Sequence, residues 1–114
     1  MKIAVSPAVE DKNYQVITFS GEFDKAGQSE IKDELTKAVK ETSRAVVIFD
    51  FSDLKFINSE GIGYLMEIHT HLINKDKKLI IVGLKDNVKD VFGTIGINDI
   101  IPIHASLDAY LKSL

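Results

Sequence analysis

The chain has 114 residues, no cysteine and a formal net charge of −3. This length suits one domain, and the interspersed lysines and acids lack the basic stripe that a nucleic-acid-binding surface needs. Without cysteine there is no disulfide framework, cysteine-based metal site or thiol nucleophile, which fits a cytoplasmic protein. The sequence has neither a secretion signal nor an apolar run of about 18 residues, so we expect no membrane partner.

The first two expected elements form a strand hairpin. Residues 2–9 and 14–20 have strand-like composition, and the polar residues 10–13 between them favour a turn. Pro7 cannot donate a hydrogen bond to a neighbouring strand, so we expect the first strand at an edge of the sheet. From about residue 27 to residue 41, apolar residues recur at the spacing of an amphipathic helix.

The most apolar run of the chain, residues 45–51, predicts a strand that is buried on both faces. Asp50 is expected near its end, in the loop that leads to Ser59. From Ile62 onward the apolar spacing is that of one helix face. Ser59 therefore falls where the helix begins and where backbone N–H groups have no intrahelical partner. A hydroxyl group at this position is accessible to solvent and to a partner protein.

The rest of the chain continues the alternation of strands and helices. Residues 78–83 predict a strand, Asp86 is expected to cap a helix that ends near Gly96, and residues 100–103 predict a last edge strand before a short helix capped by Ser106. The order predicts an α/β fold, with a mixed sheet of four to five strands covered by about four helices. Sites in such sheets form beyond the carboxyl ends of the strands.

Three stretches resemble the signature of the STAS domain family, the bacterial anti-sigma factor antagonists. They are residues 48–52 (IFDFS), residues 56–63 (FINSEGIG) and residues 21–24 (GEFD), the last being similar to the family's Gly-Glu-Leu-Asp. In the family, an aspartate is followed by a phosphorylatable serine, a second serine or threonine, and Gly-Leu-Gly. The resemblance covers nearly the whole chain and implies a single STAS domain over residues 1–114.

The resemblance implies a binding module that is not an enzyme and needs no cofactor. The unphosphorylated chain would dock on a serine kinase that is also an anti-sigma factor, and this docking would release the sigma factor. Phosphorylation of Ser59 would end the docking, and a serine phosphatase would restore it. The expected partner-binding residues around this serine are Asp24, Asn58, Ser59, Glu60, Gly61, Gly63 and Tyr64.

Several of these residues also have a purely structural explanation. Asp24 can cap a turn, and Tyr64 can simply pack against the core. Gly61 and Gly63 are poor helix formers, so they indicate either tight packing of this turn on the sheet or a surface without side chains that a kinase can approach closely. The sequence alone does not decide between the structural and the partner-binding explanation of these residues.

The chain departs from the family pattern at two positions. Asn58 stands where the family usually has aspartate, and Glu60 stands where it usually has serine or threonine. Asn58 can still cap the helix. Glu60 is favourable to the helix dipole but places a negative charge beside the serine. These departures keep open an alternative, a STAS-fold scaffold or signalling adaptor without direct sigma-factor control.

Two other classes fit the residues less well. A serine hydrolase would need Gly-x-Ser-x-Gly directly after a strand, but Ile57 occupies the first position. A receiver domain would use Asp50 as the phosphoacceptor and would need an acidic pair after the first strand, where Ser6 and Pro7 stand instead.

Overall fold

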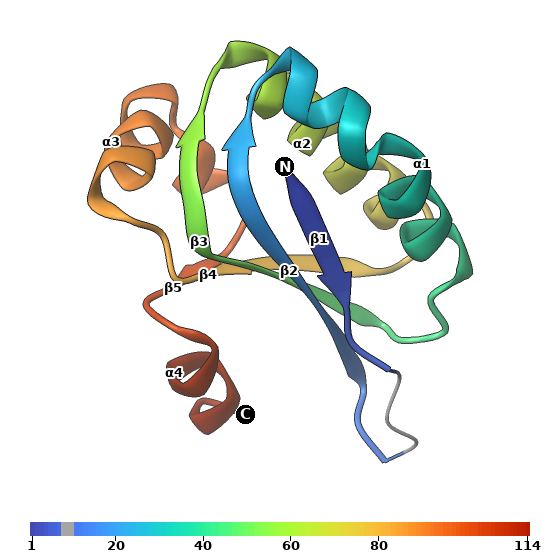
Figure 1. The fold of residues 1–114 in the computed structure, drawn as a ribbon. Coiled ribbons are helices and arrows are strands. Elements are labelled where there is room, and N and C mark those ends of the chain that lie inside the picture. Colours follow the sequence, from blue (N-terminus) through green and yellow to red (C-terminus); the bar gives the residue numbers. More distant parts are fainter. Residues whose placement is uncertain (8–10) are drawn as a thin grey trace.

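The computed structural model describes residues 1–7 and 11–114. Within these residues, a five-stranded sheet carries four α-helices (Figure 1), which confirms the predicted α/β class. The elements in chain order are β1 (Lys2–Val5), β2 (Tyr14–Phe23), α1 (Lys25–Glu41), β3 (Val46–Ile57), α2 (Ser59–Asn74), β4 (Lys78–Val82), α3 (Asp86–Ile95), the 3₁₀ helix η1 (Ile97–Asp99), β5 (Ile103–His104) and α4 (Leu107–Lys112).

The strands lie in the sheet in their sequence order, β1-β2-β3-β4-β5. β1 is antiparallel to β2, and every later neighbouring pair is parallel. Because parallel crossovers are right-handed and each new strand adds on the same side, α1, α2 and α3 pack on one face of the sheet. α4 lies on the other face. β1 is an edge strand, as Pro7 predicted, and part of its predicted end at residues 8–9 lies outside the described residues.

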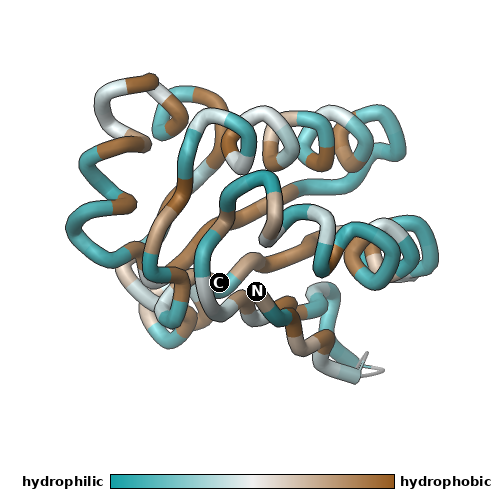
Figure 2. Tube along the Cα trace, turned by 45° about the horizontal axis from the view of Figure 1, so that its top comes forward, coloured by the Kyte–Doolittle hydropathy of each residue, from teal (hydrophilic) through white to brown (hydrophobic). Residues whose placement is uncertain are grey.

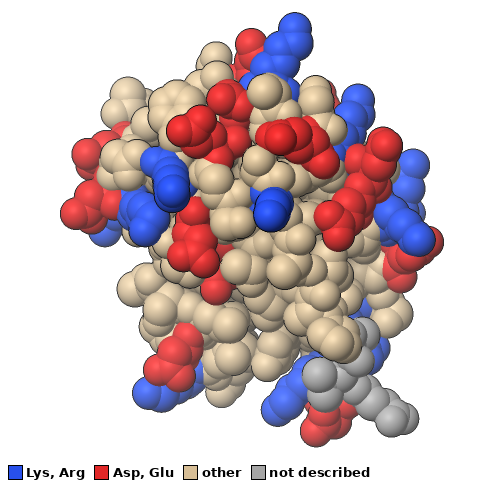
Figure 3. Space-filling view, viewed as in Figure 1, with Lys and Arg blue, Asp and Glu red and all other residues tan. Residues whose placement is uncertain are grey.

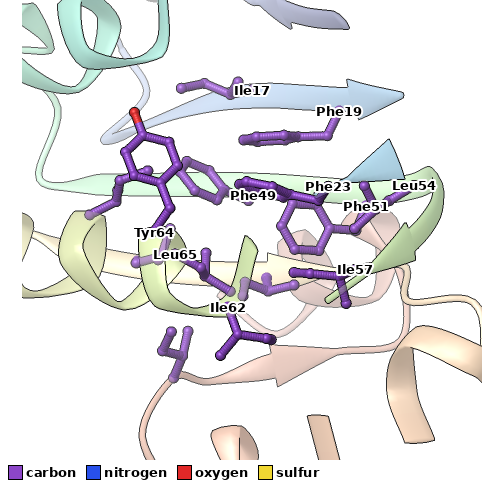
Figure 4. Packing of buried hydrophobic residues seen from close by; sticks show 14 of the residues in the cluster. Ile17, Phe19, Phe23, Phe49, Phe51, Leu54, Ile57, Ile62, Tyr64 and Leu65 are labelled. Atoms are coloured by element: carbon purple, nitrogen blue, oxygen red, sulfur yellow. The ribbon is translucent and has the colours of Figure 1, made fainter. Parts of the chain in front are cut away.

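The main core fills the space between the sheet and α1, α2 and α3. Figure 2 shows apolar residues along the inner strands and on the inward turns of the helices. Phe19, Phe49 and Phe51 are fully buried at its centre (Figure 4), with ring centroids 4.7 Å apart for Phe19 and Phe49. A smaller cluster, which includes Ile48 and Tyr110, lies under α4. The two clusters hold the sheet from both sides.

β3 is longer than predicted and changes the environment of Asp50. The strand continues to Ile57 because β2 also continues and pairs with it, up to Phe23 beside Ile57. Leu54 and Ile57 are buried along this extension. The prediction that Asp50 shares a loop with Ser59 is therefore wrong. Asp50 lies within β3, and its Oδ1 accepts hydrogen bonds from the backbone N–H and the hydroxyl of Ser52.

Two details of the C-terminal part also differ from the prediction. The N-cap of α3 is Lys85, which makes no side-chain capping bond, so the expected cap at Asp86 is wrong. The last strand is only Ile103–His104. Its expected start lies in a tight turn instead, where the N–H groups of Ile100 and Ile101 both donate to the carbonyl of Ile97 at 2.9 Å.

Candidate partner-binding site

Ser59 is exposed and is the first residue of α2. Asn58 precedes it in an extended conformation, and its Oδ1 accepts hydrogen bonds from the N–H groups of Glu60 and Gly61, both at 3.1 Å. The predicted cap is thus confirmed. Since the carbonyl of Asn58 also accepts from the N–H of Ile62 at 2.9 Å, the first turn is regular and the Ser59 side chain is not needed to hold it.

The cap leads to a prediction about stability. Asn58→Ala is expected to lower the free energy of unfolding by about 1 kcal/mol, because it leaves two N–H groups without their acceptor. Asn58→Asp, the matched control, retains an acceptor oxygen and should stay close to the wild type. Urea unfolding of the three proteins tests this expectation. Equal loss in both variants would mean that the amide, and not the capping oxygen, matters at this position.

Asp24 starts α1 in the same way that Asn58 starts α2. Its Oδ1 accepts from the N–H of Gly27 at 2.8 Å. The two helix starts are neighbours, because Phe23 and Ile57 pair at the ends of β2 and β3 and the N–H of Asn58 donates to the carbonyl of Phe23 at 3.3 Å. Asp24 and the Ser59 turn therefore lie at the same end of the sheet. The carboxylate of Asp24 serves as the N-cap of α1.

The structure separates the two glycines of the motif. A Cβ atom on Gly61 would lie 2.2 Å from the carbonyl oxygen of Phe23 and 2.9 Å from Cγ1 of Ile57. Gly61 is therefore explained by close packing of α2 on the ends of β2 and β3. A Cβ atom on Gly63 would meet nothing within 4 Å, and Gly63 is exposed. Packing does not explain Gly63, which leaves a surface without a side chain one turn from Ser59.

Glu60 and Tyr64 lie in different environments. Glu60 is exposed beside Ser59, whereas Tyr64 is only 7% exposed. The Tyr64 ring packs edge-on against Phe23 with centroids 6.2 Å apart (Figure 4), and its hydroxyl lies 3.4 Å from Oγ1 of Thr36 on α1. Tyr64 also lines a hollow of about 150 Å³ between α1 and α2. It packs as a core residue, and its role toward a partner stays a prediction.

Phe56 is a feature of this surface to which sequence reasoning assigned no role. The side chain is 44% exposed, although it stands in a strand and three residues before Ser59. Large exposed aromatic residues are common anchors of protein interfaces. No signal in the sequence marks this exposure, because Phe56 is apolar and residues 52–57 do not form an apolar run. Phe56, Ser59, Glu60 and Gly63 form the candidate contact surface.

The fold and the exposed helix start define a small α/β domain with a five-stranded sheet and four α-helices in the described residues. None of the helices in residues 1–7 and 11–114 has the length and apolar character needed to cross a membrane. In the same part of the chain, no cluster of three or more His, Asp or Glu side chains could hold a metal ion. The sequence pattern of the STAS domain matches residues 6–110, so the chain belongs to the STAS domain family.

Similar proteins include one that matches in sequence and two that match in structure. The anti-sigma-B factor antagonist of Staphylococcus aureus (strain NCTC 8325 / PS 47) is 24% identical over 104 residues, which cover 91% of this chain and 94% of the relative. The crystal structure of an anti-sigma factor antagonist from Mycobacterium paratuberculosis has a TM-score of 0.81 at 20% identity, covering 98% of this chain and 93% of the other. The phosphorylated form of the Bacillus cell fate determinant SpoIIAA has a TM-score of 0.66 at 19% identity, covering 97% and 100%.

Proposed function

We propose that this chain, as a single STAS domain, is an anti-sigma factor antagonist whose docking is switched by phosphorylation of Ser59. The observation that carries the proposal is an exposed serine at the first position of α2, where Asn58 already supplies the cap. The relatives support it, since they are named as antagonists and SpoIIAA exists in unphosphorylated and phosphorylated forms. Partner switching of this kind takes place in the cytoplasm.

In the unphosphorylated state, the contact surface docks on a serine kinase that is also an anti-sigma factor, and the sigma factor is released. Gly63 lets the partner approach the backbone of α2 closely because no side chain stands there. Phe56 supplies apolar area at one end of the surface. The hydroxyl of Ser59 is small and uncharged, so it is buried in the contact at low cost.

A phosphate on Ser59 changes the charge of this surface. It adds close to two negative charges and strong acceptor oxygens, next to the exposed carboxylate of Glu60. The start of α2 tolerates the phosphate because the positive end of the helix dipole favours an anion there. The domain therefore keeps its fold, and docking is lost because the charged phosphate must be desolvated at the contact.

The chain itself acts as substrate and binding partner, and it is not an enzyme. The carboxylates of Asp24 and Asp50 already accept hydrogen bonds within the chain, from the N–H of Gly27 and from Ser52. The kinase supplies the nucleotide, and a serine phosphatase removes the phosphate. This assignment needs no cofactor on the chain.

Incubation with the cognate kinase and ATP, followed by mass spectrometry of peptides, tests the proposal. We expect a single phosphate on Ser59, its loss in Ser59→Ala, and its retention in Ser106→Ala. Ser106 is the matched control because it is another exposed serine at a helix start, with its hydroxyl engaged as the cap of α4. Phosphate on Ser106, or an unmodified Ser59 when a family control is modified, would refute the proposed site.

A further inference from the structure

A hollow beside β1 lies outside the set of residues that form the contact surface. It has a volume of about 480 Å³, and its lining includes Lys2, Ser20, Gly21, Asp53, Lys55 and Lys85. β1 runs antiparallel to β2, so it begins at the end of the sheet where the parallel strands terminate. Lys85 follows the end of β4. The hollow therefore lies beside the last residues of β2 and β3, past the end of β4.

The three lysines come from different elements whose backbones are held together. Lys2 pairs with Ser20 across β1 and β2, and Ser20 pairs with Asp53 across β2 and β3. Lys55 follows on β3, and its carbonyl accepts a hydrogen bond from Nδ2 of Asn87 at 2.8 Å. This bond joins the first turn of α3 to β3 and so fixes the position of Lys85, the N-cap of α3. The three lysines therefore line the same hollow although they come from different elements.

The charges in this lining are unbalanced. In the part of the chain that the structure describes, no ion pair or hydrogen bond engages the ammonium group of Lys2, Lys55 or Lys85. The one carboxylate among the lining residues is that of Asp53. Figure 3 shows charged side chains of both signs over this end of the molecule, whereas the lower part of the same face has few. Three unpaired cations in a chain of net charge −3 repel one another and attract anions.

The floor of the hollow favours a ligand that comes close to the backbone. Gly21 has φ 107°, a conformation that L side chains rarely adopt, and a Cβ atom there would lie 3.1 Å from Cα of Met1. With glycine at this position, no side chain covers the backbone at this part of the hollow. The Ser20 hydroxyl can donate to an anion, and the Asp53 carboxylate can accept from a hydroxyl or ammonium group on the rest of a ligand.

We propose that this hollow binds a small oxyanion with two or more negative charges, namely a phosphate group that is either free or carried by a small polar molecule. The lysines neutralise the phosphate, and Asp53 contacts the organic part where one is present. Residues of α2 do not line the hollow, so Ser59 takes no part in this binding.

Amide NMR titrations of the full chain test this site, with inorganic phosphate, glycerol 3-phosphate and glycerol as probes at constant ionic strength. Saturable shifts are expected around Lys2, Gly21, Lys55 and Lys85 with both phosphates and not with glycerol. Tighter binding of glycerol 3-phosphate would identify the ligand as a phosphate ester, and equal binding would identify it as the free ion. Shifts that do not saturate, or that spread evenly over the chain, would overturn the proposal.

Two substitutions with opposite expected signs sharpen the test. The triple variant Lys2→Gln, Lys55→Gln, Lys85→Gln should weaken phosphate binding by about tenfold or more, because three nearby positive charges are lost. Asp53→Asn should tighten binding of inorganic phosphate by about threefold, because a repulsive charge is removed. Lys85→Gln alone serves if the triple variant does not fold.

The matched control changes the same number of charges elsewhere. Its substitutions are at the exposed residues Lys32 and Lys37 on α1 and Lys75 at the end of α2, each replaced by glutamine. Phosphate affinity should change by less than about twofold, because charges on remote exposed side chains are largely screened by salt. Equal losses in the two triple variants would show that only the overall charge matters, and the proposed site would be wrong.

Discussion

Phosphorylation of Ser59 is expected to weaken docking on the anti-sigma factor kinase by about 5- to 150-fold, a coupling of about 1–3 kcal/mol. The cause is local, since the phosphate adds charge to an exposed surface that already carries Glu60. Isothermal titration of the kinase with both forms of the chain, at the same nucleotide concentration, measures the change. Circular dichroism of the two forms should agree, because Asn58 caps α2 in both.

Two variants distinguish this switch from a mere loss of the side chain. Ser59→Ala should dock as tightly as the wild type and should no longer be released when ATP is added. Ser59→Asp carries one negative charge in place of nearly two, so its affinity should fall between those of the two natural forms. Equal affinity of the phosphorylated and unphosphorylated chains would contradict the proposed switch even if Ser59 is modified.

Much of the fold could be predicted from the sequence because its helices have a clear apolar spacing. Ile31, Leu35 and Val39 are buried on α1, as their spacing indicates. Right-handed connections then determine which face of the sheet the helices cover. The extension of β3 was missed because residues 52–57 are mostly polar or exposed and do not form an apolar run. Only pairing with the end of β2, a contact distant in sequence, makes this segment a strand.

The parts of the site that depend on interactions between residues close in sequence could be predicted. Asn58 lies next to the helix that it caps, so its capping bonds follow from sequence position alone. The burial of Tyr64 depends on Thr36 and Phe23, which belong to other elements. The exposure of Phe56 likewise depends on where β2 and β3 end. Tertiary contacts decide these properties, and a single sequence does not show them.

Replacing the two glycines of α2 by alanine is expected to change the free energy of unfolding in opposite directions. Gly61→Ala is expected to lower the free energy of unfolding by about 2–3 kcal/mol, because a methyl group cannot fit 2.2 Å from the carbonyl oxygen of Phe23 without moving α2 off the sheet. Gly63→Ala should raise it by about 0.5–1 kcal/mol, because alanine is the better helix former and nothing lies within 4 Å of the new Cβ. Urea unfolding of both variants measures these changes.

The same pair separates a packing role from a docking role. Gly63→Ala should fold more stably than the wild type and yet be phosphorylated more slowly by the kinase, because its methyl group stands on the exposed surface one turn from Ser59. Loss of stability in this variant would contradict the open environment of Gly63. Normal phosphorylation of a stable Gly63→Ala variant would show that the kinase does not approach this part of α2. The contact surface would then extend from Ser59 toward Phe56 instead.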